Sequence, residues 1–422
     1  MVDWVSLGNH KLVMLVVDRR LKPEVYNLDI DVTQVEAWIS DNFSDPEKRE
    51  QCLDEDVDDP DAIFRQLDPL IAPLRNCTKP KDLLVFSATA PLHPLPLHAL
   101  KVCEDGRQIT LIERNPVVYC PGLTIYEQCV TKALHTLTQT PSANVNHDIG
   151  NRGIRLAAVY DVTDENLHLL PERNAIYTHM QRLAAQMCPT TPLLWGAEVT
   201  KSRFREFVDD AGLIHFHGHC NFDATNVLRQ RLVLARKTDD AVPVAISTPA
   251  PILALSITSQ PVERKKDELF LLHTSENSNY LNSSDEDNSE AESLTVREIF
   301  SLPLASSPHV TLIACDSAMQ NVGPGDEPLG IATAFLCAGA ASFMGTLWSM
   351  PSREGRAFSD SFYASFHEQS GEEYVNLAQA LQNAVVNIMR NPKSRSFRYW
   401  APLVLHGAWF CKRFEEIHQC RT

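Results

Sequence analysis

The stretches Leu213-Ile-His-Phe-His-Gly-His-Cys220 and Val310-Thr-Leu-Ile-Ala-Cys-Asp-Ser-Ala318 decide how this sequence folds. Each begins as a short apolar run and ends abruptly in reactive side chains. Such runs are typical of strands that are buried in a parallel sheet. In an open α/β sheet, functional residues gather at the carboxyl ends of the strands. We therefore expect these strand ends to bring a histidine and a cysteine face to face across a cleft.

The sequence on either side of these stretches alternates between strand and helix patterns. Further strands are expected over residues 154–160, 193–195 and 342–347, and helices over 174–187, 200–209, 329–338 and 357–366. This alternation predicts an α/β fold with a mostly parallel sheet flanked by helices.

The first 150 residues show a similar but less regular pattern. Strands are expected at 12–17, 25–29, 83–86 and 117–119, and helices from 32 onward, at 63–74 and at 124–137. Residues 44–60 are acidic and polar, which predicts a loop. The polar stretch 138–152, with Pro141 and Gly150, is the expected boundary between a domain of residues 1–150 and one of residues 151–422.

The overall charge and hydropathy exclude two classes of function. The chain of 422 residues carries 38 Lys and Arg against 54 Asp and Glu, a net charge of −16, and an acidic surface repels nucleic-acid phosphates. The early apolar run Leu12–Val17 is too short for a signal peptide or a membrane span, and no later window is long enough. We expect no nucleic-acid partner and no membrane association.

The cysteines point to a reducing compartment. There are 11 of them and no Cys-x-x-Cys pair, so zinc ribbons and thioredoxin-like sites have no support. An odd number of cysteines in mostly apolar surroundings favours reduced thiols and a cytoplasmic location.

One segment interrupts the alternation. Residues 273–294 are rich in Ser, Asn, Asp and Glu and have few apolar groups. Such a segment cannot bury enough surface to offset its ordering entropy, which predicts a disordered acidic insertion inside the second domain.

The histidine and cysteine at the strand ends allow three interpretations. A nearby imidazole lowers the pKa of a thiol, and the thiolate is a nucleophile toward carbonyl carbon. The first alternative is that the cysteine is an inert core thiol and the histidines are structural. The second is a metal cluster of His215, His217, His219 and Cys220, which lacks an obvious carboxylate or thiol pair nearby. Spacing alone does not decide among them.

A wider set of motifs resembles the CHAT domain, a caspase-like peptidase family of the group that includes separases and caspases. The two stretches resemble its catalytic signatures, in which an apolar strand leads to His and another leads to Ser/Ala-Cys. The flanking segments agree in order along nearly the whole chain: 83–100, 113–123, 325–331, 334–340, 342–348 and 399–407.

The resemblance implies a role for each matching residue. It makes Cys315 the nucleophile and His219 the general acid and base of a Cys–His dyad, with the backbone N–H groups of Cys220 and Cys315 as oxyanion donors. It implies a caspase-like fold whose N-terminal half is catalytically silent, with no cofactor or metal. The substrate would be one or a few proteins, cut in regulated proteolysis connected with cell death or conflict signalling.

The sequence departs from the family pattern in three places. Cys220 stands where the family has a glycine after the catalytic histidine. The stretch Ser349–Ser352 lacks the carboxylate that relatives use to bind a basic P1 side chain, which predicts a small or apolar P1 residue. The chain also lacks the tetratricopeptide-type repeats that usually accompany such domains, so repeats or a regulatory partner are expected on another segment.

The sequence also gives candidates for the substrate pocket and for structural histidines. The acids that remain as candidates for the substrate pocket are Asp316, Asp326, Glu327 and Glu354. His215 and His217 are expected to be structural. A second hypothesis is a catalytically impaired fold that acts as a protein-interaction module, and the Cys220 departure is its main support.

Overall fold

The computed structural model describes residues 1–53, 62–138, 153–160, 164–189, 191–223, 225–236, 291–323, 326–369 and 373–414. The expected domain boundary at 138–152 and the expected insertion at 273–294 lie outside these residues, except for Thr138 and residues 291–294.

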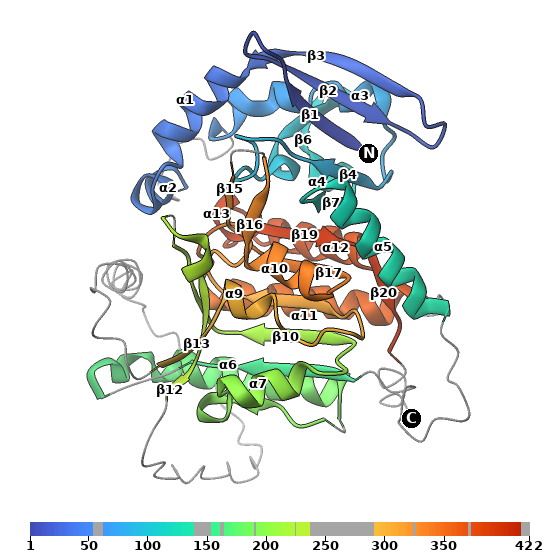
Figure 1. The fold of residues 1–422 in the computed structure, drawn as a ribbon. Helices are drawn as coiled ribbons and strands as arrows, with labels where there is room; N and C mark the ends of the chain where they lie inside the picture. The colour runs from blue at the N-terminus through green and yellow to red at the C-terminus, as the bar shows by residue number, and fades with distance from the viewer. Residues whose placement is uncertain are drawn as a thin grey trace, which may run out of the picture.

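One sheet of eleven strands runs through the described chain (Figure 1). Its order is β3 (Pro23–Asp31), β2 (Lys11–Val17), β1 (Val2–Ser6), β4 (Leu84–Ser87), β7 (Val117–Cys120), β19 (Leu403–Gly407), β17 (Ser342–Thr346), β14 (His309–Ile313), β10 (Leu213–His217), β8 (Ile154–Ala158) and β9 (Leu194–Trp195). Only β3–β2, β2–β1 and β19–β17 pair antiparallel among the described neighbours. The sheet is therefore mixed but mostly parallel, as predicted.

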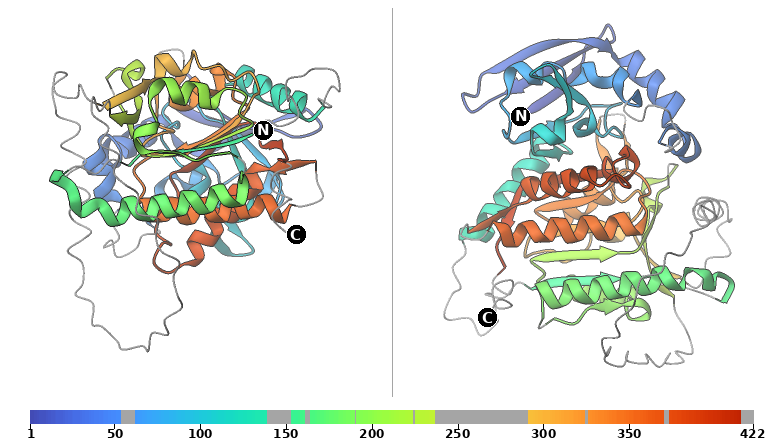
Figure 2. Two further views of the ribbon diagram at one scale, coloured as in Figure 1. Left: turned by 90° about the horizontal axis from the view of Figure 1, so that it is seen from below. Right: turned by 180° about the vertical axis from the view of Figure 1, so that it is seen from behind.

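Helices cover both faces of this sheet. Their bounds are α1 (Val32–Asn42), α2 (Pro46–Cys52), α3 (Leu74–Cys77), α4 (Leu111–Arg114), α5 (Leu123–Thr138), α6 (Leu170–Met187), α7 (Lys201–Val208), α9 (Val296–Ile299), α10 (Ile331–Ala338), α11 (Ser352–Glu368), α12 (Leu377–Arg390) and α13 (Phe397–Trp400). In Figure 2, α6, α11 and α12 lie on one face of the sheet, and α7, α9 and α10 lie on the other. No helix in the described ranges is long and apolar enough to cross a bilayer.

Within the described residues, four small sheets lie outside the main one. They pair β5 (Lys101–Glu104) with β6 (Arg107–Thr110), β11 (His219–Asn221) with β12 (Arg231–Arg236) and β13 (Ala291–Thr295), β15 (Gln320–Val322) with β16 (Pro328–Gly330), and β18 (Tyr374–Asn376) with β20 (Phe410–Lys412).

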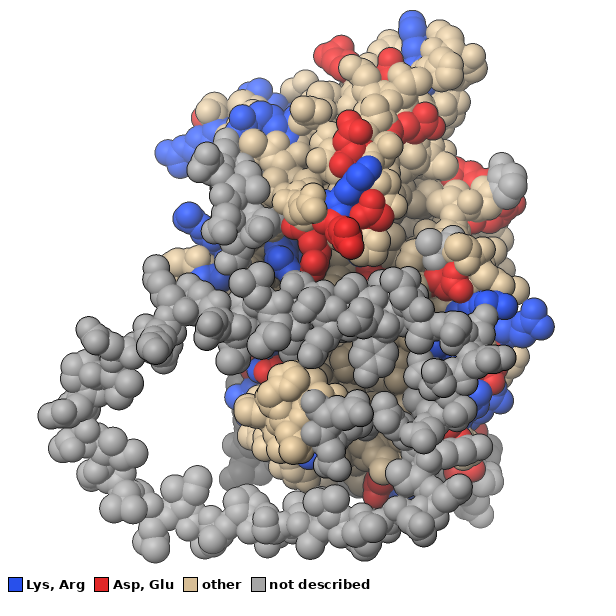
Figure 3. Space-filling view, turned by 90° about the vertical axis from the view of Figure 1, so that its left-hand side faces the viewer, with Lys and Arg blue, Asp and Glu red and all other residues tan. Residues whose placement is uncertain are grey.

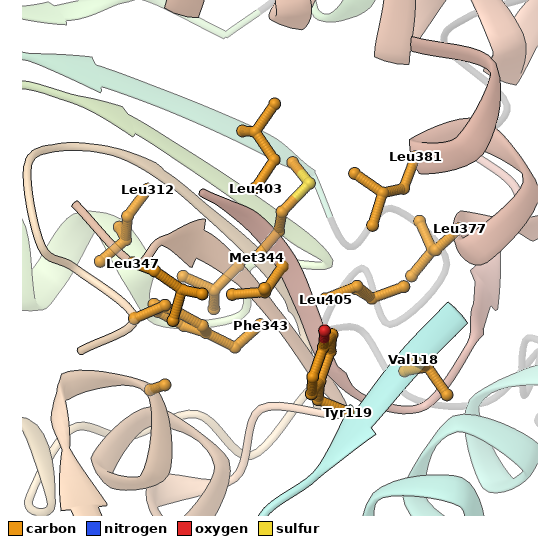
Figure 4. Close-up of a cluster of buried hydrophobic side chains, with 14 of the residues drawn as sticks. Val118, Tyr119, Leu312, Phe343, Met344, Leu347, Leu377, Leu381, Leu403 and Leu405 are labelled. Atoms are coloured by element: carbon orange, nitrogen blue, oxygen red, sulfur yellow. The ribbon is translucent and has the colours of Figure 1, made fainter. Parts of the chain in front are cut away.

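Strand β19 joins the two expected domains into one sheet. It comes from the C-terminal part of the chain, yet it lies between β7 and β17. Figure 4 shows the buried side chains at this junction, where α12 packs over β7, β19 and β17. They include Val118, Tyr119, Phe343, Met344, Leu377, Leu381, Leu403 and Leu405. The apolar core is thus continuous across the two parts of the chain.

The expected loop at 44–60 contains a helix, so that prediction is wrong. Helix α2 spans Pro46–Cys52, and the side chain of Asp45 accepts a hydrogen bond from the backbone N–H of Lys48. An aspartate cap followed by proline at the first helical position is a helix-start signal. The prediction of a loop rested on the acidic, polar composition of the segment and did not take this helix-start signal into account.

Two other expectations need correction. The helix expected at 63–74 is instead a 3₁₀ turn at Arg65–Leu70 followed by the short α3. Pro69 and Pro73 interrupt the pattern, because proline cannot donate the backbone hydrogen bond. The insertion ends earlier than expected, because Ala291–Thr295 forms β13 and Leu294 is fully buried opposite Leu232.

Candidate active site

The ends of β10 and β14 lie side by side in register. The two strands pair in parallel from Leu213 with His309 to His217 with Ile313. The backbone N–H of Gly218 continues the ladder by donating to the carbonyl of Ile313 at 3.1 Å. His219 and Cys315 are each the second residue after the last ladder pair. Both therefore leave the sheet at its carboxyl edge, on neighbouring strands.

Cys315 is partly buried at this edge, and its Sγ lies 3.2 Å from the Oγ of Ser349. Ser349 follows the end of β17, the strand on the other side of β14. Burial raises the pKa of the Cys315 thiol, the Asp316 carboxylate raises it further, and the hydrogen bond with Ser349 opposes both. The resting sulfur is therefore a thiol that needs a base to become a nucleophile.

The turn that carries Cys315 is tied to β17. Thr346 donates through its backbone N–H to Ser317 Oγ at 3.1 Å and through its hydroxyl to the carbonyl of Ala314 at 2.8 Å. Asp316 has a φ of +55°, a left-handed conformation that residues other than glycine rarely adopt. Strained backbone of this kind persists only where the surrounding contacts hold it. The nucleophile candidate thus lies on a constrained turn.

His219 begins β11 and is exposed. Its ring lies 5.3 Å from the ring of Tyr160, which follows β8. The next residue, Cys220, pairs with Leu232 of β12 and is buried, and burial raises its pKa well above the ordinary thiol range. At this strand end the imidazole of His219 is thus exposed, and the thiol of Cys220 is buried.

His215 and His217 occupy different surroundings from His219, because both lie buried in β10 against α11. His215 Nδ1 lies 2.9 Å from the hydroxyl of Tyr363, and His217 Nε2 lies 3.0 Å from the hydroxyl of Ser352. Burial lowers the pKa of His215 to about 3 and that of His217 well below its ordinary value. Both rings are neutral at physiological pH.

Three of the four pocket acids are already paired within the chain, and Asp316 and Glu354 are two of them. Asp316 accepts a hydrogen bond at 3.0 Å from the guanidinium of Arg49 in α2. Burial raises the pKa of Asp316, and the charge of Arg49 opposes that rise. Glu354 is buried at the start of α11, where the hydroxyl of Ser394 donates to it at 3.3 Å.

The other two acids lie at the β15–β16 hairpin. Asp326 accepts hydrogen bonds at 2.7 Å from the Thr89 hydroxyl and from the backbone N–H of Ala90, and lies 3.1 Å from His93 Nε2. Glu327 is exposed. Asp316, Glu354 and Asp326 thus bind to three different parts of the chain, and the four acids do not gather in one cluster.

Metal ligation has no support in the described part of the chain. Within those residues, no group of three or more His, Cys, Asp or Glu side chains is arranged to hold an ion. Buried His215 and His217 are directed to hydroxyl partners, while His219 is exposed, so the metal cluster considered from the sequence is not assembled here.

Several residues at this edge were not predicted. Ser349, Tyr160 and Arg49 all lie near Cys315 or its neighbours, from three separate parts of the sequence. A serine after Leu347-Trp348 has no distinctive pattern, and nothing near residue 49 predicts a contact 267 residues away. Such partners follow from the topology alone.

A family comparison covers most of this chain. The model of the CHAT domain matches residues 62–408, a range that contains both His219 and Cys315. No curated protein matches the sequence.

Solved structures give a second comparison. The Saccharomyces cerevisiae separase–securin complex is similar in two structures, both with 12% identity and a TM-score of 0.43. These matches cover 78% and 94% of this chain but 15% and 21% of the separase chains. The Arg-specific cysteine proteinase gingipain R (RgpB) of Porphyromonas gingivalis matches with 9% identity and a TM-score of 0.42, over 79% of this chain and 64% of its own. The chain thus spans a small part of the separase chains that it matches.

Proposed function

This chain belongs to the CHAT domain family, and from that premise we propose that it is a cysteine endopeptidase with a Cys315–His219 dyad. The observation that supports this most is the register of β10 and β14, in which both residues lie two positions beyond the last ladder pair. We place the active half at residues 151–422 and the catalytically silent half at residues 1–150.

The proposed reaction uses the dyad in two steps. His219 accepts the proton of the Cys315 thiol, and the thiolate attacks the carbonyl carbon of the scissile peptide. The carbon–nitrogen bond then breaks, and the imidazolium gives its proton to the leaving amine. Water, deprotonated by His219, hydrolyses the thioester and returns the thiol.

The tetrahedral intermediate needs hydrogen-bond donors for its oxygen. We assign this role to the backbone N–H groups of Cys220 and Cys315, which follow the same two strands. Cys220 stands where the family has glycine, so this strand end has less conformational freedom than that of its relatives.

The pairing of the pocket acids supports a small or apolar P1 residue. A cationic P1 side chain needs a carboxylate to pair with, since an unpaired buried cation is costly. Asp316, Asp326 and Glu354 already have partners within the chain, and Glu327 is exposed.

The proposed biological setting is regulated proteolysis in the cytoplasm, in cell death or conflict signalling. The substrate would be one or a few proteins, with tetratricopeptide-type repeats or a regulatory partner controlling access. No cofactor enters the proposed chemistry, because the dyad generates its own nucleophile.

A second function, a protein-interaction module without activity, is favoured by two observations. Cys220 replaces the family glycine, and burial raises the pKa of Cys315. A module needs neither a reactive thiol nor an oxyanion site.

One experiment separates the two functions. The full chain is incubated with a proteome-derived peptide library, and new N-termini are identified by mass spectrometry, with Cys315→Ala as the control. The peptidase proposal predicts a set of cleavages that the variant does not make. Identical peptide patterns for both proteins, together with an unreactive Cys315, would instead support the module.

A further inference from the structure

Helix α2 lies against the nucleophile turn, although it is outside the part of the chain that matches the family model. That match begins at residue 62, whereas α2 spans Pro46–Cys52. In Figure 1, α2 follows α1 away from β1–β3, and Arg398 of α13 contacts it. The family pattern therefore assigns no role to its side chains.

Three contacts hold this segment in place. Arg49 Nη2 donates to Asp316 Oδ1 at 3.0 Å, and Arg398 Nη2 donates to Glu50 Oε1 at 3.3 Å. Between α1 and α2, the ring of Phe43 packs at 5.7 Å against Trp348, the residue before Ser349. The segment is thus anchored to the turn that carries Cys315, to α13 and to the residue before Ser349.

The Arg49–Asp316 pair is shielded from solvent. The side chains are 11% and 20% exposed, so their interaction is screened far less than that of a surface ion pair. Figure 3 shows the side of the molecule on which α2 lies, where acidic side chains gather around a few basic ones.

Asp316 and Ser349 act in opposite directions on the ionisation of Cys315. The carboxylate of Asp316 opposes its ionisation, Tyr160 and Cys220 lie close enough to interact with it, and His219 lies at the same sheet edge. Glu50 adds negative charge near Asp316 and is paired with Arg398, whereas Arg49 is the cation that pairs with Asp316. A carboxylate next to a thiol favours the thiol, unless a nearby cation compensates its charge.

We propose that Arg49 is a positioning residue for the nucleophile, which compensates the charge of Asp316 and holds the Cys315 turn in its left-handed conformation. The inference rests on the proposed function only in naming Cys315 the nucleophile. It gives the N-terminal segment, outside the matched region, a part in the active site.

The test measures the ionisation of Cys315 without any substrate. The full chain and its variants are alkylated with iodoacetamide over a range of pH, and mass spectrometry follows the Cys315 peptide. Arg49→Met keeps most of the side-chain length but removes the charge. Its alkylation midpoint should move to higher pH by roughly half to one unit, which is a three- to tenfold slower reaction near neutrality.

Two further variants locate the cause. Asp316→Asn removes the charge that Arg49 compensates, so its midpoint should lie below that of the wild type. The double variant Arg49→Met with Asp316→Asn should behave like Asp316→Asn alone. Arg49→Lys retains the charge and should recover most of the wild-type behaviour.

The matched control is Glu50→Gln, which breaks the other ion pair of α2 and leaves Arg49 in place. Its midpoint should not rise. An equal rise in Glu50→Gln would show that docking of α2, and not the charge of Arg49, sets the reactivity, and would overturn the proposal. An Arg49→Met midpoint at or below that of the wild type would also overturn the proposal. It would show that Asp316 either becomes protonated or has no effect on the ionisation of Cys315.

Thermal unfolding of each variant accompanies the measurement. If Arg49→Met does not fold, Asp316→Asn and Arg49→Lys still test the proposal. An alkylation midpoint of Asp316→Asn equal to that of the wild type would contradict it. Because alkylation needs no peptidase activity, an inactive protein with the expected midpoints would refute the proposed function and leave this inference standing.

Discussion

The hydroxyl of Ser349 lies 3.2 Å from the sulfur of Cys315, across the boundary between β17 and β14. The hydrogen bond stabilises the thiolate and opposes the effect of burial on the pKa of Cys315. In the resting structure, the sulfur therefore has a fixed polar partner before any substrate arrives.

Ser349→Ala should therefore raise the pKa of Cys315. We expect alkylation of Cys315 near neutral pH to slow by about three- to tenfold, since one hydrogen bond to a charged group is worth roughly 1 kcal/mol or more. Ser352→Ala is the control, because Ser352 bonds to His217 and not to the cysteine. Equal reactivity of Ser349→Ala and the wild type would show that this contact does not stabilise the thiolate.

Substitution of the dyad should abolish cleavage and leave the fold intact. Cys315→Ala and His219→Ala should each lower the rate by at least about 10³-fold, because the two residues act as a unit. His219 is exposed, so its loss leaves no cavity. Cleavage by Cys315→Ala at the wild-type rate would refute the assignment of the nucleophile.

His215→Ala should affect stability more than turnover. The ring is fully buried and bonded to Tyr363, so the variant leaves a cavity and removes one hydrogen-bond partner of the Tyr363 hydroxyl. We expect a loss of roughly 2–4 kcal/mol in the free energy of unfolding, measured in urea. Should activity vanish while stability is unchanged, His215 and not His219 would be the essential histidine.

Acid should destabilise the fold from about pH 6.5 downward. Burial lowers the pKa values of His98, His215, His309 and His406 to about 3, whereas these rings titrate near 6.5 when exposed. Below pH 6.5 the unfolded chain binds protons that the folded chain does not, so stability is present above that pH and falls as the pH falls. Each group contributes up to about 1.4 kcal/mol per pH unit.

Urea unfolding at pH 7.5, 6.5 and 5.5 measures this slope. His406 provides the matched variant, because its ring nitrogens have no hydrogen-bond partner among the described residues. His406→Leu should reduce the dependence of the unfolding free energy on pH by the contribution of one histidine, up to about 1.4 kcal/mol per pH unit. A stability that does not change over this range would contradict the buried, neutral state of these rings.

Deletions should distinguish the acidic segment from the strand that follows it. Composition predicts that removing residues 273–290 leaves the unfolding temperature nearly unchanged. Removing 273–294 also deletes Leu294, which is fully buried and paired with Leu232. That larger deletion should cost roughly 2–5 kcal/mol. Equal destabilisation by both deletions would show that residues 273–290 pack against the fold.

The P1 preference should be small or apolar. Peptide-library profiling measures it directly, with Cys315→Ala as the blank. A strict requirement for Arg or Lys would refute the expectation. Neutralising Asp316, Asp326, Glu327 and Glu354 one at a time would then locate the acid that turns toward substrate.

Most of the main sheet was predictable from the sequence, and its less regular edge was not. β10 and β14 are mostly apolar and are buried along their whole length, as central strands of a parallel sheet are. β1 and α2 were missed: Val2–Ser6 alternates buried and exposed residues over a short span, and α2 buries no side chain. Elements that bury few side chains have only a weak periodic pattern of apolar residues, so they are hard to predict from the sequence.

The sequence by itself determined the class of fold and the two strands that end in His219 and Cys315, because burial and periodicity act on consecutive residues. Only the tertiary structure decided what surrounds those ends. Ser349, Asp316 and Arg49 meet there because the chain crosses between strands and α2 folds back over the sheet edge. A hydrogen bond or ion pair between residues tens or hundreds of positions apart leaves no local pattern, so it is decided by how the elements pack.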